Sequence, residues 1–333
     1  MKKTNENYIT KIIVFFIVIM SIGIVFRKIY YKEIINSERI NIITYKNDNQ
    51  GYHPKVLYFE KKWNGFKYWM AFTPYKNANS DLENPCINAS NDMINWEVPN
   101  GLINPLDIPI NVDKVHYNSD THLVYNNSSN QLEIFWRFVN DKDNEVTIYK
   151  STSSDGTNWS DKEVFLYSPN RKEQDYVSPA IILENNKYRI WYVHRQKVWY
   201  MEKTVDNNKL TEAKTLDINY KNNMKTWHLD LIHNENMYEM VTVAYQNVNN
   251  RSEMSVYYTK SKDNIKWDIP QEIIKPSTIS NKFDSYGLYR ASILKKDKNY
   301  YIFYSGHDTQ YNVGIGLMFG NDINRLRGFE VKK

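Results

Sequence analysis

The sequence of 333 residues has little cysteine and little glycine. Its one cysteine, Cys86, excludes an internal disulfide and any site built from several cysteines. The 11 glycines form no phosphate-binding loop and no nucleophile elbow, so we expect no cofactor. Neither charge dominates, because 43 lysines and arginines are scattered among 38 aspartates and glutamates. The resulting net charge of +5 is mild, and we expect no nucleic-acid partner.

Aromatic residues are abundant, with 27 Tyr and 9 Trp, and one motif recurs three times. The motif Ser-x-Asp-x-x-x-Trp occupies residues 90–96, 153–159 and 261–267. Each copy follows an aromatic-rich run that is typical of a β-strand. Aspartate and serine side chains accept hydrogen bonds from nearby backbone N–H groups in turns. The motif therefore predicts a tight hairpin with a structural role, and its Trp begins the next strand.

The three hairpins belong to five repeated units, each with a short apolar run, a polar turn and an aromatic strand. The apolar runs begin the units and cover residues 56–58, 123–125, 181–183, 231–232 and 293–294. The third and fifth units lack the hairpin motif. Repeats of this length are typical of radially arranged sheets. We predict an all-β, five-bladed β-propeller of four-stranded antiparallel blades over residues 51–333.

The N-terminal region differs in composition from the propeller. Residues 12–26 are uncharged and nearly all apolar, and basic residues flank them on both sides. We predict a short tail over residues 1–8, one transmembrane helix as an anchor over 9–26, and a polar stalk over 27–50. A cleaved signal peptide is the alternative. The anchor would place the protein in the lipid bilayer of the cell membrane, single-pass, with the propeller outside the cytoplasm.

Strand 1 of every unit carries polar side chains at equivalent positions. Three residues before each apolar run, the chain has His53, Asp120, Ser178, His228 and Arg290. Two residues later, on the same strand face, it has Lys55, His122, Ala180, Asp230 and Ser292. Surface strands also alternate in this way. The recurrence of His, Asp and Arg nevertheless favours a shared polar site near the propeller axis.

Further polar side chains are expected at the same mouth, near the ends of strand 2 or before strands 1 and 3. They are Tyr75, Glu83, Arg137, Asp175, His194 and His307. Carboxylates beside aromatic rings are typical of glycoside hydrolysis, where one carboxylic acid protonates the leaving oxygen and the other carboxylate activates water or attacks. Arg137 and Arg290 could bind an acidic sugar or a phosphate.

The sequence contains no motif that is typical of a metal site. Four histidines could join nearby aspartates at the axis: His53, His122, His228 and His307. No short His-x-x-x-His segment and no Asp-rich loop requires such a site. We therefore assign no metal ligand.

On these features the chain resembles the five-bladed propeller glycosidases, the superfamily of arabinanases, xylosidases and invertases. The resemblance covers about residues 50–331 and rests on the blade count, the hairpin motif and the start of strand 1. It implies a carboxylate at the head of strand 1 in blades 1, 2 and 3. Asp120 matches in blade 2. Blade 1 has His53 instead of Asp, and blade 3 has Val177 two residues before Pro179, where the superfamily has Glu.

Three interpretations of the function remain open. The first is a glycoside hydrolase-like enzyme acting on a cell-surface or environmental polysaccharide, with Asp120 and Glu83 as the acid pair. Asp230 and Asp175 are the alternative catalytic partners. Substrate binding would then involve His53, Tyr75, Arg137, Ser178, His194, His228, Arg290 and His307. The second interpretation is a non-catalytic propeller that binds glycan, and the third is a docking protein for polysaccharide assembly; we favour the enzyme.

Overall fold

The computed structural model describes Ile13, Val14, Met20 and residues 34–110, 115–234, 236–246 and 254–330. Ile35–Lys333 form one compact unit. The predicted anchor lies outside the described residues, apart from the three isolated ones. No helix among the described residues has the length and apolar character needed to span a membrane.

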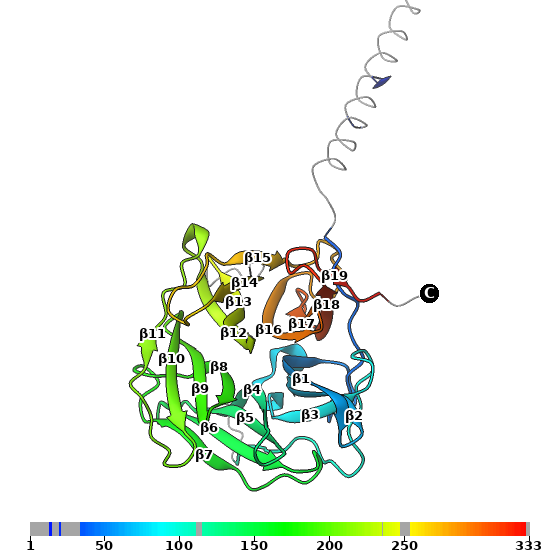
Figure 1. The fold of residues 1–333 in the computed structure, drawn as a ribbon. Coiled ribbons are helices and arrows are strands. Elements are labelled where there is room, and N and C mark those ends of the chain that lie inside the picture. Colours follow the sequence, from blue (N-terminus) through cyan, green and yellow to red (C-terminus); the bar gives the residue numbers. More distant parts are fainter. Residues whose placement is uncertain are drawn as a thin grey trace, which may run out of the picture. The chain divides into compact units, whose positions relative to one another are not determined.

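Five antiparallel sheets surround a common centre, and each is a meander of consecutive strands (Figure 1). Blade 1 comprises β1 (Gly51–Trp63), β2 (Phe66–Pro74) and β3 (Cys86–Ser90). Blade 2 comprises β4 (His116–Asn126), β5 (Gln131–Asn140), β6 (Glu145–Ser153) and β7 (Glu163–Ser168). Within the described residues, blade 1 has a single bridge between Ala89 and Glu97 in place of its fourth strand.

The other three blades have four strands each, which confirms the predicted architecture. Blade 3 comprises β8 (Val177–Glu184), β9 (Lys187–His194), β10 (Lys197–Thr204) and β11 (Lys214–Thr215). Blade 4 comprises β12 (Lys225–Asn234), β13 (Met237–Tyr245), β14 (Ser255–Ser261) and β15 (Gln271–Ile274). Blade 5 comprises β16 (Gly287–Lys296), β17 (Asn299–His307), β18 (Val313–Gly320) and β19 (Arg327–Gly328). Three 3-10 helices lie in the connections: η1 (Lys76–Ala78), η2 (Ser80–Leu82) and η3 (Lys221–Asn223).

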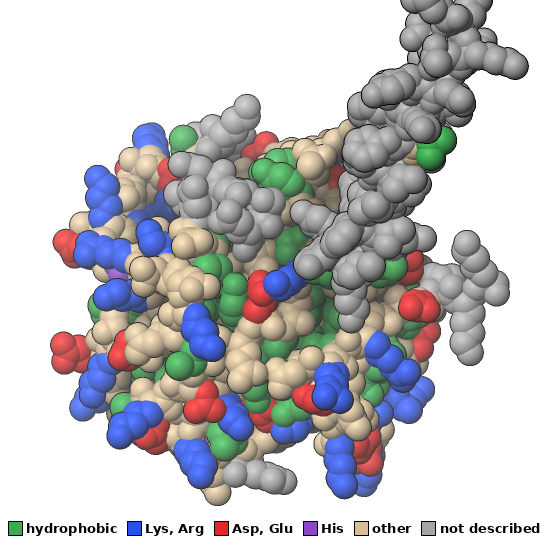
Figure 2. Space-filling view, turned by 90° about the horizontal axis from the view of Figure 1, so that it is seen from above, with side chains coloured by type: hydrophobic (Ala, Val, Ile, Leu, Met, Phe, Trp, Pro, Cys, Tyr) green, Lys and Arg blue, Asp and Glu red, His purple; other side chains and the backbone are tan. Residues whose placement is uncertain are grey.

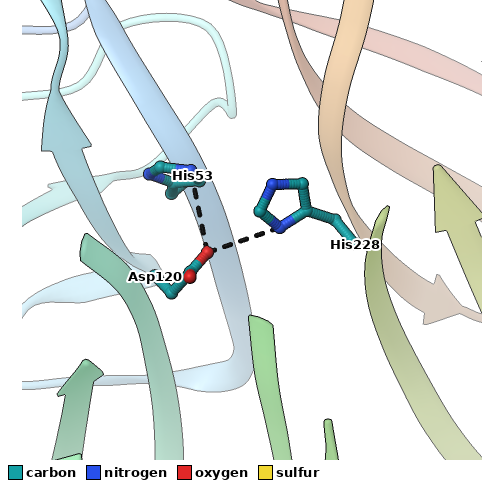
Figure 3. Close-up of side chains that lie close together, drawn as sticks. All are labelled: His53, Asp120 and His228. Atoms are coloured by element: carbon teal, nitrogen blue, oxygen red, sulfur yellow. Dashed lines mark ion pairs between the residues drawn. The ribbon is translucent and has the colours of Figure 1, made fainter. Parts of the chain in front are cut away.

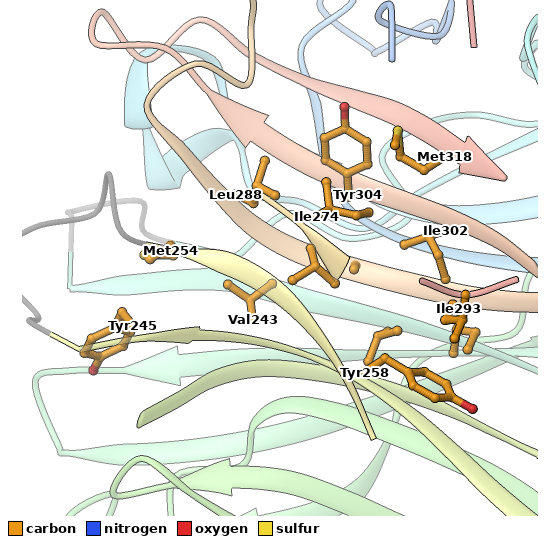
Figure 4. Close-up of a cluster of buried hydrophobic side chains, with 14 of the residues drawn as sticks. Val243, Tyr245, Met254, Tyr258, Ile274, Leu288, Ile293, Ile302, Tyr304 and Met318 are labelled. Carbon is orange, nitrogen blue, oxygen red and sulfur yellow. The ribbon is translucent and has the colours of Figure 1, made fainter. Parts of the chain in front are cut away.

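The first strands of the five blades form the inner ring, because β1, β4, β8, β12 and β16 contact one another in a closed cycle. Apolar side chains of neighbouring blades fill the wedges between the sheets. In one wedge, Val243 and Tyr258 of blade 4 pack with Ile293 and Ile302 of blade 5 (Figure 4). The burial of each such side chain stabilises the fold by about 1.5–3 kcal/mol relative to exposure. The core is therefore distributed between the blades and leaves the axis to polar residues.

Every inner strand has a register shift at the same end. In blades 1, 2 and 3 the shift is accompanied by a positive φ at His53 (50°), Asp120 (49°) and Ser178 (53°). A β-bulge inserts extra residues into one strand and redirects the side chains at that point. The repeated bulge is the local structure that turns these side chains away from ordinary strand alternation.

Part of the segment expected as a stalk packs on the propeller. Ile40 and Ile42 are buried against blades 1 and 5. The Ile40 N–H donates to Ile315 O of blade 5 at 2.9 Å, and the Trp96 N–H donates to Asn41 O at 2.8 Å. This segment therefore connects the last blade with the first one.

The repeated motif forms the predicted hairpins. In the first copy, Asp92 Oδ1 accepts hydrogen bonds from the N–H groups of Ile94 and Asn95, both at 2.8 Å. Asp155 and Asp263 accept the equivalent bonds in blades 2 and 4. Basic and acidic side chains are interspersed on the face of the molecule shown in Figure 2, as the mixed composition predicts.

Candidate functional site

The residues predicted at the bulged end of strand 1 converge on Asp120. Its Oδ1 lies 3.7 Å from His53 Nε2 and 3.3 Å from His228 Nδ1 (Figure 3). Arg290 Nη1 donates to the same oxygen at 3.3 Å. Ser178, which occupies the equivalent position in blade 3, has a different partner. Its Oγ donates to Leu229 O at 3.2 Å, and this bond links two inner strands.

A pocket of about 400 Å³ opens above this cluster. Seven of the predicted site residues line it: His53, Tyr75, Glu83, Asp120, Arg137, Asp175 and His228. They come from four inner or second strands and from two loops at the same mouth. The structure therefore brings these seven predicted residues together at one mouth.

Asp230, expected as an alternative catalytic carboxylate, does not line the pocket. It is buried one layer below, where Lys55 Nζ donates to its two oxygens at 2.7 and 2.9 Å. The Ile293 N–H donates to it at 3.0 Å. These bonds occupy the carboxylate, so Asp230 supports the floor of the pocket and is not placed to act on a substrate.

Four predicted substrate-binding residues also lie outside the pocket lining: Ser178, His194, Arg290 and His307. Ser178 and Arg290 are buried beneath the pocket. His194 packs edge-on against Trp199, and the His307 ring stacks on Tyr311 with 4.7 Å between centroids. His194 is the last residue of β9 and His307 is the last residue of β17.

Glu83 is buried beside His53, with 3.5 Å between its Oε1 and His53 Nδ1. Burial raises the pKa of Glu83 well above its usual range, and the charge of Asp120 raises it further. Its place in the pocket and its raised pKa make Glu83 a candidate for general acid–base chemistry.

Asp120 is the opposite case. Burial acts to raise its pKa, but His228, His53 and Arg290 outweigh this effect and hold the pKa well below its usual range. Burial lowers the pKa of both histidines, which favours their neutral form. The cluster therefore presents one carboxylate and two imidazoles with lone pairs available as ligands.

The geometry of the three side chains suits a divalent cation. Their ligand atoms all lie within 4.8 Å of one another. Metal–nitrogen and metal–oxygen bonds of about 2.0–2.2 Å place neighbouring ligand atoms roughly 3–4 Å apart. The distances from Asp120 to His53 and His228 fall in this range.

His228 gives a second indication of a ligand. Its Nδ1 contacts Asp120 Oδ1 at 3.3 Å, but among the described residues its buried Nε2 has no hydrogen-bond partner. A buried polar atom is normally paired, so the unsatisfied Nε2 indicates a missing partner. Two histidines and one carboxylate, with the remaining positions open to the pocket, are a common donor set for a catalytic divalent metal.

Several pocket residues were not identified from the sequence. The main ones are Tyr117, Asp141, Arg171, Trp227 and Tyr289. Trp227 and Tyr289 immediately precede two of the predicted axis residues, so the same alignment shifted by one position would have found them. The Tyr289 ring lies 4.6 Å from that of His228 and 5.5 Å from that of His53, measured between centroids. Loop residues such as Arg171 have no repeat position and gave no signal.

The fold is that of the five-bladed β-propeller glycoside hydrolases. An exo-1,5-α-L-arabinanase from a bovine ruminal metagenomic library aligns with a TM-score of 0.59 and 13% identity, over 86% of this chain and 99% of its own. A thermostable family-43 glycoside hydrolase aligns with a TM-score of 0.61 and 13% identity, over 88% and 96% of the two chains. No protein-family model matches the sequence.

A deacetylase has the same fold with higher similarity. The crystal structure of an N-acetylgalactosamine deacetylase from F. plautii, in complex with blood group B trisaccharide, aligns with a TM-score of 0.74 and 20% identity over 86% of this chain and 94% of that chain. In sequence, the A type blood N-acetyl-α-D-galactosamine deacetylase of Flavonifractor plautii is 25% identical over 294 residues. The match covers 74% of this chain but only 38% of that protein.

Proposed function

We propose that this propeller is a metal-dependent carbohydrate deacetylase, which hydrolyses the acetamido group of an N-acetylated amino sugar. The observation that carries the proposal is the cluster of His53, Asp120 and His228 at the bottom of the pocket. A glycosidase of this fold is expected to carry carboxylates at the heads of three inner strands. This chain has a set of metal-binding donors instead, and one of its relatives is a deacetylase.

The reaction consumes one water and breaks the C–N bond of the amide, giving acetate and the free amine. A divalent cation at the cluster would polarise the amide carbonyl and lower the pKa of water. Thr73 holds His53 by a contact of 2.9 Å between Thr73 Oγ1 and His53 Nδ1, which directs His53 Nε2 towards Asp120. Second contacts of this kind fix the orientation of a ligating imidazole.

Glu83 is the acid–base residue in this proposal. It lines the pocket 3.5 Å from His53, so it lies next to the position where water and the amide would react. It can accept a proton from the attacking water and return it to the departing nitrogen, which must leave as an amine. One carboxyl group can therefore carry out both proton transfers by general acid–base catalysis.

A glycoside hydrolase is the second candidate. It is favoured by the division between Glu83, whose pKa is raised, and Asp120, whose pKa is lowered. A glycosidase needs such a protonated acid together with an ionised carboxylate. The two candidates differ in product, because the deacetylase releases acetate and the glycosidase releases a reducing sugar.

The test uses the full chain treated with a chelator and reloaded with Zn²⁺, Mn²⁺ or Co²⁺. Acetate and reducing sugar are measured with glycosides of N-acetylated hexosamines. We expect acetate release that depends on the metal. Asp120→Asn and His228→Gln should lose bound metal and activity, whereas Glu83→Gln should keep the metal and lose activity by about 10²- to 10⁴-fold.

Asp322→Asn, on the outer part of blade 5, is the matched control and should behave as the wild type. Acetate release that survives complete removal of metal would contradict the proposed role of the cluster. Release of reducing sugar without acetate would favour the glycosidase.

We also propose that the enzyme acts outside the cytoplasm, held by the apolar segment at residues 9–26. The composition of that segment supports this placement. Fractionation of cells that express the full chain tests it, and recovery of the protein from the cytoplasmic fraction alone would contradict it.

A further inference from the structure

One side of the pocket consists of ion pairs and is called here the ion-paired wall. Its members are Arg137, Asp141, Arg171 and Asp175. Arg137 Nη2 and Arg171 Nε both donate to Asp175 Oδ1, the second at 2.9 Å. Arg171 also pairs with Asp141 through its Nη1. The wall therefore joins β5 and the turn after it to the loop that precedes β8.

The charges of the ion-paired wall cancel, because two guanidinium groups face two carboxylates. The charge of Asp175 raises the pKa of Arg137 against the effect of burial, so this guanidinium is firmly paired. An anionic substituent would have to displace Asp175 from both arginines. The sequence-based expectation that Arg137 binds an acidic sugar is therefore not favoured by its contacts.

The ion-paired wall still has hydrogen-bond donors and acceptors that can bind neutral hydroxyl groups. Arg137 has five N–H donors, and its hydrogen bonds to Asp175 and Ser119 use three of them, one at a length of 3.4 Å. Asp175 Oδ2 accepts only one bond of 3.4 Å, from Arg171, among the described residues. Asp175 and Arg171 are both partly exposed in the pocket. A carboxylate oxygen beside a guanidinium fork offers one acceptor and one donor to adjacent hydroxyls.

The rest of the pocket suits the body of a sugar ring. Tyr75, Trp227 and Tyr289 contribute aromatic surface to the same lining. Among the described residues, the buried Trp227 Nε1 has no hydrogen-bond partner, so it can donate to a ligand oxygen. A pyranose has apolar C–H faces and hydroxyls at its edge, which matches aromatic rings combined with a polar wall.

We infer that the ion-paired wall determines specificity by binding two neighbouring hydroxyls of a neutral sugar, with Asp175 as the acceptor and Arg137 and Arg171 as donors. This inference rests on the proposed function, because the sugar is the one whose acetamido group reaches the His53, Asp120 and His228 cluster. Asp175 is then a residue of substrate recognition, and the sequence-based assignment of it as a catalytic carboxylate is replaced.

The experiment compares an N-acetylhexosamine glycoside with analogues that each lack one ring hydroxyl. Asp175→Asn keeps the shape of the wall but turns an acceptor into a donor. We expect its KM for the parent sugar to rise about 10- to 100-fold, with kcat changed by no more than about threefold. The wild type should discriminate against two of the deoxy analogues, and the variant should lose that discrimination.

Arg171→Lys provides an independent variant, because it keeps the charge and removes the planar fork. Its side chain is partly exposed, so the substitution is compatible with folding. Asp322→Asn is again the control. A variant with unaltered discrimination between parent and deoxy sugars would overturn the inference, and so would tight binding of an acidic sugar through the same wall.

Failure of the proposed function gives a different result. Calorimetric binding of the same sugars to the full chain needs no turnover. Binding that depends on two hydroxyls and on Asp175, without acetate release, would support the wall and reject the deacetylase. Acetate release that does not depend on the ring hydroxyls would support the deacetylase and reject the wall.

Discussion

Lys55 and Asp230 form an ion pair that is almost completely buried beneath the pocket. They come from the inner strands of blades 1 and 4, which are not neighbours in the ring, so the pair crosses the axis. Removing two charges from water costs several kcal/mol each, and only good geometry offsets that cost. The two bonds from Lys55 and the backbone donor of Ile293 supply this geometry. The pair explains why two polar side chains occupy buried positions of the inner strands, where apolar side chains would otherwise be expected.

We predict that Lys55→Met lowers the free energy of unfolding by about 3–5 kcal/mol, because it leaves the carboxylate of Asp230 buried without its partner. The double variant Lys55→Met/Asp230→Asn removes both charges and should recover much of this loss. Denaturant unfolding of the two single variants and the double variant measures the coupling. A loss in the double variant equal to the sum of the two single losses would show that the pair is not coupled.

The hairpins are the elements that the sequence repeats most clearly, and they also contact neighbouring blades. Asn64 Nδ2, in the turn between β1 and β2, donates to Ser154 O of the second hairpin. Gly156 in that hairpin has a φ of +80°, and a Cβ atom there would lie 2.2 Å from the Trp69 ring of blade 1. The motif therefore fixes both the turn and the packing of blade 2 against blade 1.

Gly156→Ala should be strongly destabilising for these two reasons. A positive φ costs an alanine about 1 kcal/mol, and the clash with buried Trp69 adds about 1–3 kcal/mol. Gly65→Ala is the matched control, because Gly65 has a φ of +89° and nothing within 4 Å of its Cβ position. Thermal unfolding should show a clearly larger drop in Tm for Gly156→Ala. Similar drops in both variants would mean that the contact with Trp69 contributes little.

At the scale of the whole molecule, the ring must be closed between its last and first blades. Residues 36–42 lie at this junction, where the Asn36 side chain donates to Asp284 and Ile40 bonds to β18. Asp284 also accepts a hydrogen bond of 2.7 Å from Tyr304, and burial raises its pKa. A segment outside the five repeats therefore contributes to the closure of the propeller.

Ile40→Ala should lower the free energy of unfolding by about 2–4 kcal/mol, as expected for a large side chain removed from a packed core. Ile43→Ala is the control in the same segment, because Ile43 is 42% exposed and its loss should cost less than about 1 kcal/mol. Denaturant unfolding of both variants tests the prediction. A mild effect at Ile40 would indicate that the segment is dispensable, as a stalk would be.

The sequence by itself determined the blade count and the positions of the axis residues. Both depend on local regularities, namely the turn chemistry of the Ser-x-Asp-x-x-x-Trp hairpins and the alternation of side chains along a strand. These regularities repeat in every blade, so aligning the units was enough to place His53, Asp120 and His228 at one mouth.

Only the tertiary structure decided which of these side chains meet. The bulges of strand 1, together with ring closure, bring His53 and His228 to Asp120 and leave Ser178 bonded to Leu229. They also place Asp230 one layer lower, against Lys55. Distances across the axis depend on the twist and tilt of all five sheets together, and no local sequence pattern encodes them. The positions of the loop residues in the pocket depend on the same closure, which is why Arg171 was found only in the folded molecule.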